Sequence, residues 1–75
     1  MDEVDFEREF ESAMKNKLGF VTVTIEGGTF VYADRYEIIP MSGGVYVDLY
    51  YLNRIVGGAF LDNVVTVHPW RYQYE

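Results

Sequence analysis

The hydrophobic period of the chain changes at Gly19, and this change decides what the chain can fold into. Before it, apolar side chains recur at the three- and four-residue spacing of one helical face: Phe6, Phe10, Ala13 and Met14. After it, apolar and polar residues alternate, as they do in strands that bury one face. The sequence therefore predicts an α+β fold, with an N-terminal amphipathic helix over residues 2–18 packed on a small antiparallel sheet.

Both ends of the predicted helix carry signals. Asp2 is a suitable N-cap, and acidic residues in the first turn complement the positive end of the helix dipole. Lys15 and Lys17 complement the negative end, and Gly19 then supplies a stop.

Three double glycines divide the remaining chain into segments of strand length: Gly27-Gly28, Gly43-Gly44 and Gly57-Gly58. Residues 29–39 are expected to form one strand that is long enough to bend, the alternative being two strands around a bulge. Residues Leu61-Asp62-Asn63 are expected to form a tight turn or one 3₁₀ turn. We predict a β-meander of four or five strands over residues 20–68, forming a sheet or barrel. An aromatic tail, 69–75, completes a single domain, 1–75.

The order of these elements, a helix, four or five short antiparallel strands and a brief connection before the last strand, resembles the small Sm-like and SH3-like barrels. The resemblance covers residues 3–68 and concerns the plan of the fold. The glycine that Sm proteins place within their second strand would fall in residues 31–33, which are Val-Tyr-Ala here. No function is carried over from this resemblance.

Length and composition indicate that a partner stabilises the fold. A chain of 75 residues buries only about 60% of its unfolded surface, and proteins of this size usually add disulfides, a metal or a second subunit. The chain has no cysteine and one histidine, so a partner or a second copy is the remaining means. Its 49% hydrophobic content excludes a disordered chain. No apolar stretch approaches the ~20 residues that cross a membrane, and we expect a cytoplasmic protein.

The residues suited to catalysis are few. A hydrolytic triad would need Ser42, His68 and one of three aspartates, Asp34, Asp48 or Asp62. Ser42 lies in Met-Ser-Gly-Gly, which is a turn sequence without the strand-to-helix elbow that exposes a nucleophile. A lone histidine without any thiolate gives no metal constellation. We therefore predict a protein that is not an enzyme and that has no metal site and no cofactor.

The acidity of the chain is concentrated in its first element. Residues 1–11 contain six acids and Arg8, a net charge of −5, whereas the other 64 residues contain six acids and five bases, a net of −1. On a helix the carboxylates form two rows: Asp2, Asp5 and Glu9 on one flank, and Glu3, Glu7 and Glu11 on the other. The rows are either a solvated helix face or a substitute for phosphates that enters the basic groove of a nucleic-acid-handling protein. The residues predicted to bind such a partner are Glu3, Asp5, Glu7, Glu9 and Glu11.

The aromatic residues indicate a second binding surface. Seven tyrosines, five phenylalanines and one tryptophan cannot all fit inside one small core, and tyrosine and tryptophan are enriched at protein interfaces. We expect one sheet face to carry four tyrosines with two interleaved acids: Tyr32, Tyr36, Tyr46, Tyr50, Asp34 and Asp48. Trp70 either joins the tail residues at the surface or caps the barrel under the helix. The aromatic residues predicted to bind a partner are Tyr46, Tyr50, Trp70 and Tyr72.

These observations favour a small acidic module that binds another protein. A compact, cysteine-free, acidic chain without catalytic groups is typical of virus- or plasmid-encoded antagonists that inhibit a host protein, here one with a basic nucleic-acid-binding groove. Direct nucleic-acid binding ranks second, because Asp34 and Asp48 would repel a phosphate chain. A third alternative is a homo-oligomeric scaffold, in which a tail strand pairs with a neighbour's edge to form a homodimer or ring.

Overall fold

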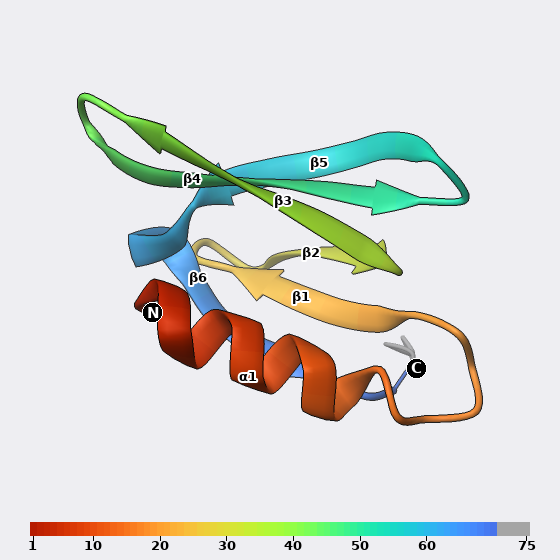
Figure 1. The fold of residues 1–75 in the computed structure, drawn as a ribbon. Coiled ribbons are helices and arrows are strands. Elements are labelled where there is room, and N and C mark those ends of the chain that lie inside the picture. Colours follow the sequence, from red (N-terminus) through yellow and green to blue (C-terminus); the bar gives the residue numbers. More distant parts are fainter. Residues whose placement is uncertain (71–75) are drawn as a thin grey trace.

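The computed structural model describes residues 1–70 and contains one helix and six strands in two antiparallel sheets (Figure 1). Sheet A has the strand order β2-β1-β6, and sheet B has the order β3-β4-β5. The elements are α1 Glu3–Ala13, β1 Val21–Ile25, β2 Thr29–Ala33, β3 Arg35–Met41, β4 Gly44–Tyr51, β5 Arg54–Phe60, the 3₁₀ turn η1 Leu61–Asn63 and β6 Val64–His68. No helix in this part of the chain is long and apolar enough to cross a membrane.

The helix begins where the sequence predicts and ends earlier. Asp2 is the N-cap, and its carboxylate accepts a hydrogen bond from the backbone N–H of Asp5. The expected continuation to residue 18 is wrong, because α1 ends at Ala13. The side chain of Asn16 donates to the backbone carbonyls of Ala13 and Phe20 and accepts from the N–H of Leu18. These bonds offer the backbone an alternative to a further helical turn, so the helix ends there.

The long strand expected over residues 29–39 is divided at Asp34, and this division creates the two sheets. β2 stays with sheet A and β3 starts sheet B. The backbone N–H of Asp34 donates to the carbonyl of Tyr50 at 2.8 Å, and its carboxylate accepts from the N–H of Leu52 at 3.1 Å. Leu52 has a positive φ of 51° in the turn between β4 and β5. The bend is therefore fixed by one side chain and by the backbone of a distant turn.

The α+β class, the N-terminal helix and the antiparallel strands are confirmed, but a single sheet of four or five strands and a closed barrel are not. Within residues 1–70, β5 pairs only with β4 and β6 pairs only with β1, so no ladder joins β5 to β6 and the ring of strands stays open. The 3₁₀ turn at η1 is confirmed between these two strands.

One core lies between the sheets and the helix. Sheet B contacts the β2 side of sheet A, and α1 contacts the β6 side, so that together they cover the inner face of sheet A. The buried apolar residues are Phe6, Phe10, Ala13, Val21, Val23, Ala33, Val47, Leu49, Ala59, Leu61, Val64 and Val67. Gly57 permits the sheets to approach, because a Cβ there would lie 3.0 Å from Cγ2 of Val31.

Three aromatic rings join the helix to sheet B. The rings of Phe6 and Phe10 lie 5.1 Å and 4.7 Å from the ring of Tyr36 on β3, centroid to centroid, in edge-to-face arrangements. Phe6 is fully buried. The helix therefore belongs to the same core as both sheets.

We expect Phe6→Ala to lower the free energy of unfolding by about 3–5 kcal/mol, because it removes a fully buried ring and leaves a cavity. A domain of this length has only about 4–11 kcal/mol of stability in total, so the change removes a large fraction of it. Urea denaturation followed by circular dichroism measures the change. Val4→Ala, on the same helix at 70% exposure, is the matched control and should change the stability by less than about 0.5 kcal/mol.

Candidate protein-interaction surfaces

The first surface is the carboxylate row of Glu3, Glu7 and Glu11, which lies on the flank of α1 that faces Tyr36 of β3. Burial raises the pKa of Tyr36 above its ordinary value of 10.0, and the negative charges of Glu7, Glu11 and Glu3 raise it further. Three carboxylates separated by whole helical turns thus act on the same phenol. The row produces one continuous region of negative potential beside the edge of sheet B.

The other carboxylate row is largely used by the fold itself. Asp2 caps the helix, and Asp5 forms an ion pair with Arg8 at an N–O distance of 2.5 Å. Glu9 lines a cavity with Val67 and Pro69. Within residues 1–70, neither Glu9 nor any carboxylate of the Glu3, Glu7 and Glu11 row has an ion pair, so the two rows differ through Asp2 and Asp5. The structure therefore separates two rows that look equivalent in the sequence.

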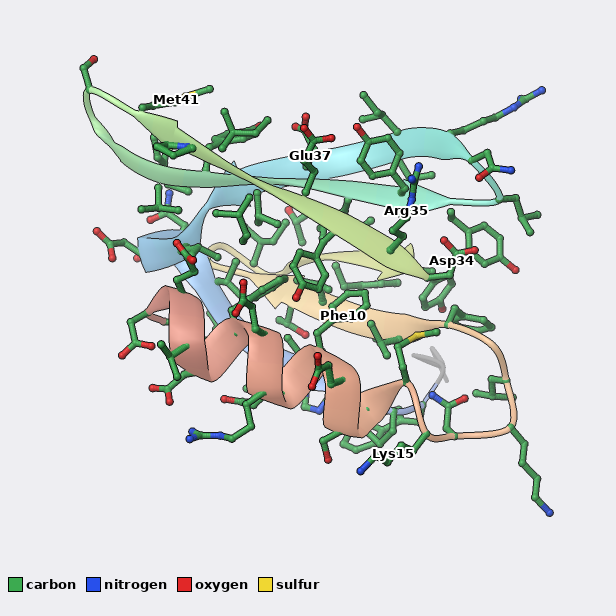
Figure 2. All side chains as sticks on the ribbon, viewed as in Figure 1. Phe10, Lys15, Asp34, Arg35, Glu37 and Met41 are labelled. Atoms are coloured by element: carbon green, nitrogen blue, oxygen red, sulfur yellow. The ribbon has the colours of Figure 1, made fainter. Side chains whose placement is uncertain are left out.

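The early end of the helix takes Lys15 away from Glu11 of the Glu3, Glu7 and Glu11 row. Lys15 would lie one helical turn after Glu11 in a continuous helix, where the pair would contribute about 0.2–0.5 kcal/mol. Lys15 instead follows the end of α1, below the helix in Figure 2, and makes no ion pair with Glu11. The row remains fully negative.

The second surface is the outer face of sheet B, where Tyr46 and Tyr50 alternate with Asp48 along β4. The guanidinium carbon of Arg35 lies 4.5 Å from the ring centre of Tyr50, and the hydroxyl of Tyr50 donates to Glu37 at 3.3 Å. Desolvation, followed by the charge and hydrogen bond of Glu37, raises the pKa of Tyr50. Tyrosine and arginine thus lie together on an exposed face, which is the composition of interface hot spots.

A glycine of β5 positions Tyr46. The rings of Tyr46 and Phe60 meet edge to face with centroids 5.2 Å apart. Tyr46 also lies across Gly58, where a Cβ would stand 2.8 Å from the tyrosine Cε2 and hydroxyl oxygen. Phe60, which the sequence analysis did not single out, therefore belongs to this surface.

The predicted face of four tyrosines is wrong in two of its members. Tyr36 pairs with Leu49 in the ladder and points into the core, where it meets the helix. Tyr32 belongs to sheet A and contacts Phe20 at 5.1 Å between ring centroids. Asp34 lies at the break between the two sheets, so the alternation assumed along 29–39 does not persist across it. Only Tyr46 and Tyr50 share the outer face of sheet B.

The two predicted surfaces lie on opposite sides of sheet B. Figure 2 shows Glu37 pointing away from the helix, and Tyr46 and Tyr50 share its face by register and contact. Tyr36, on the other side of β3, points toward the glutamate row. The structure does not join the acidic helix and the two tyrosines into one patch.

The aromatic tail begins on sheet A. Trp70 is 51% exposed and its ring lies 4.2 Å from that of His68, centroid to centroid, so it does not cap the core under the helix. The hydroxyl of Thr22, a fully buried residue, donates to the carbonyl of Trp70. Tyr72 lies outside the described residues.

The residues of the hypothetical triad are not brought together. Ser42 lies in the turn between β3 and β4, and His68 ends β6 at the opposite end of the molecule (Figure 1). The His68 ring shares a hydrogen bond with the hydroxyl of Thr66. Among residues 1–70, no group of three His, Cys, Asp or Glu side chains is placed to hold a metal ion.

Comparison with protein-family models, curated proteins and solved structures gave no match for this chain. The surfaces above are therefore the basis for any functional proposal.

We expect Glu7→Gln with Glu11→Gln to lower the pKa of Tyr36, because two of the charges that oppose ionisation of the phenol are removed. NMR titration of ¹³C-labelled tyrosine measures the pKa. Asp5→Asn, on the other row, is the control and should leave it unchanged. Because the pKa of Tyr36 is raised in the folded state, its contribution to stability is complete below pH 10 and is lost as the pH rises through the folded-state pKa. The double variant should lose less stability above pH 10 than the unaltered chain.

We expect Gly58→Ala to destabilise the protein by about 1–3 kcal/mol, since the added methyl group meets both the Tyr46 ring and the carbonyl of Val47 at 2.8 Å. Thermal denaturation measures the loss. Gly58→Ala combined with Tyr46→Ala should be less destabilising than the sum of the single changes. Additive effects would show that the glycine does not position the ring.

Proposed function

We propose that this chain is a small cytoplasmic module that binds another protein through the carboxylate row of Glu3, Glu7 and Glu11. Its partner has a basic groove that handles nucleic acid, and the chain acts as an antagonist by occupying that groove. The proposal includes neither catalysis nor a cofactor.

The observation that carries the proposal is the contrast between the two carboxylate rows. Asp2 and Asp5 have partners within the fold, whereas the glutamate row has no ion pair within residues 1–70. Like charges four residues apart on a helix cost about 0.2–0.5 kcal/mol each. The three glutamates repel one another slightly within the helix, and a cationic surface on a partner would neutralise this repulsion and attract the row.

Charge density defines what the groove must provide. Four residues of helix rise about 6 Å, so the row carries one charge per ~6 Å, whereas one strand of DNA carries one per ~3.4 Å. The row is thus less dense than the polyanion it would replace, and apolar contacts must supply the remaining affinity. Tyr36 is half buried beside the row. Tyr46 and Tyr50 remain proposed anchors for a partner large enough to extend around the edge of β3. Trp70 and Tyr72 remain proposed anchors as well.

Direct nucleic-acid binding is less well supported. This alternative rests on the resemblance of the element order in the sequence to Sm-like and SH3-like barrels, whereas the strands form two open sheets. The outer face of sheet B also places Glu37 and Asp48 next to its two tyrosines. Those carboxylates would repel a phosphate chain that approached to stack its bases.

A capture experiment tests the proposal. The tagged chain is mixed with nuclease-treated lysate from cells that contain it, at low and at high salt, and the retained proteins are identified by mass spectrometry. We expect a nucleic-acid-binding protein that dissociates at high salt, because exposed charges are screened. Added DNA should compete with the chain for this protein.

Two double variants locate the binding row. Glu7→Gln with Glu11→Gln should weaken binding at least about tenfold, which corresponds to about 1.4 kcal/mol. Asp5→Asn with Glu9→Gln removes the same charge from the other row and should retain binding. Equal losses in the two variants would show that only net charge matters, and unchanged binding in both would exclude the helix.

A further inference from the structure

The edge of β5 is the least protected strand edge of sheet B. Within residues 1–70, β5 pairs on one side only, with β4, and no other backbone hydrogen bond involves its residues. Its second side therefore presents unpaired N–H and C=O groups. Such an edge is a template for another strand unless the protein blocks it.

The opposite edge of the same sheet contains the features that block pairing. β3 includes Pro40, which has no N–H to donate, and the charged residues Arg35 and Glu37. β5 contains no proline, and its only charged residue is Arg54 at its start. Its one protective feature is a bulge at Val56, which leaves the ladder regular from Gly57 to Phe60. The residues next to Arg54 are apolar and exposed, Ile55 at 62% and Val56 at 44%. An edge of this composition is expected to be covered by a partner strand.

The charges that flank β5 indicate which strand covers it. Arg54 lies four residues before Gly58, and Asp62, in η1, lies four residues after it. In an antiparallel pair of identical strands centred on Gly58, Arg54 of each copy comes to the end of the strand where the other copy carries Asp62. The arrangement is self-complementary, as a two-fold interface requires, and it places opposite charges together twice.

We propose that β5 is a homodimer interface, in which β5 pairs antiparallel with β5 of a second copy about a two-fold axis at Gly58. Sheet B then becomes one continuous sheet of six strands. Its outer face carries the tyrosine surface of both copies, and the exposed Ile55 and Val56 lie beside the new partner strand. Asp62 lines a pocket with Glu3 at the start of the carboxylate row, but Glu7 and Glu11 are not part of it. The tests of the interface change none of the three glutamates, so the interface stands or falls independently of the proposed function.

Sedimentation velocity of the full chain over a concentration series tests the proposal. We expect a reversible monomer–dimer equilibrium that reaches twice the chain mass of 8.7 kDa. Val56→Lys places a charge on the edge and should raise the dimer dissociation constant at least about tenfold. Val65→Lys is the matched control, because Val65 is 54% exposed on β6, and it should leave the dissociation constant unchanged. Circular dichroism verifies that both variants are folded.

A charge exchange tests the two-fold register. Arg54→Asp brings carboxylates together at both ends of the paired strands and should also weaken the dimer at least about tenfold. Adding Asp62→Arg to this variant should restore the dimer. The proposal is overturned by a chain that stays monomeric at every concentration, or by assembly into a larger ring. It is also overturned if Val56→Lys or Arg54→Asp leaves the dimer dissociation constant unchanged. The same holds if adding Asp62→Arg to Arg54→Asp does not restore the dimer.

Discussion

The bend at Asp34 is the constraint on which the rest of the structure depends. Two hydrogen bonds hold the chain where it leaves sheet A and enters sheet B. The N–H of Asp34 donates to the carbonyl of Tyr50, and the carboxylate of Asp34 accepts from the N–H of Leu52. Without this break β2 and β3 would continue as one strand. The helix would then have no second sheet to meet, and the contact of Phe6 with Tyr36 would be lost. One aspartate thus determines both the layering of the core and the side of β3 that faces the acidic helix.

The sequence correctly predicts elements that depend on neighbouring residues. Its predictions are wrong where contacts between distant residues determine the structure. Asp2 as N-cap, the turns at Gly27-Gly28 and Gly43-Gly44 and the 3₁₀ turn at η1 depend on nearby residues, and each was predicted correctly. The division expected at Gly57-Gly58 is wrong, because these glycines lie inside β5 and the turn before it is at Leu52 and Asn53. The early helix end depends on Asn16 reaching Phe20, and the division of 29–39 depends on a turn at Leu52. Neither contact follows from periodicity. The placement of Arg35 on Tyr50, in contrast, follows from register once the turn after Met41 is fixed.

The candidate surfaces show the same division. The two carboxylate rows were predicted from helical spacing alone. The difference between them was not predicted, because it depends on the ion pair of Arg8 with Asp5 and on the helix ending before Lys15. The bend at Asp34 places Tyr32 and Tyr36 away from the predicted tyrosine face. Phe60 belongs to this face because it contacts Tyr46, which lies across Gly58. Pattern therefore predicts which residue types are available, and tertiary contacts decide which of them share a surface.

The pairing of β1 with β6 has a consequence for how the protein is made. Its partners, residues 21–25 and 64–68, are far apart in the sequence, and further contacts join Met1 to Leu61 and Thr22 to Trp70, which are 60 and 48 residues apart. Closing such long loops is entropically costly and slows folding. Sheet A also lacks one edge strand until β6 has been synthesised. The domain can therefore complete its fold only after translation has delivered β6, because Val64 and Val67 of this strand belong to the core.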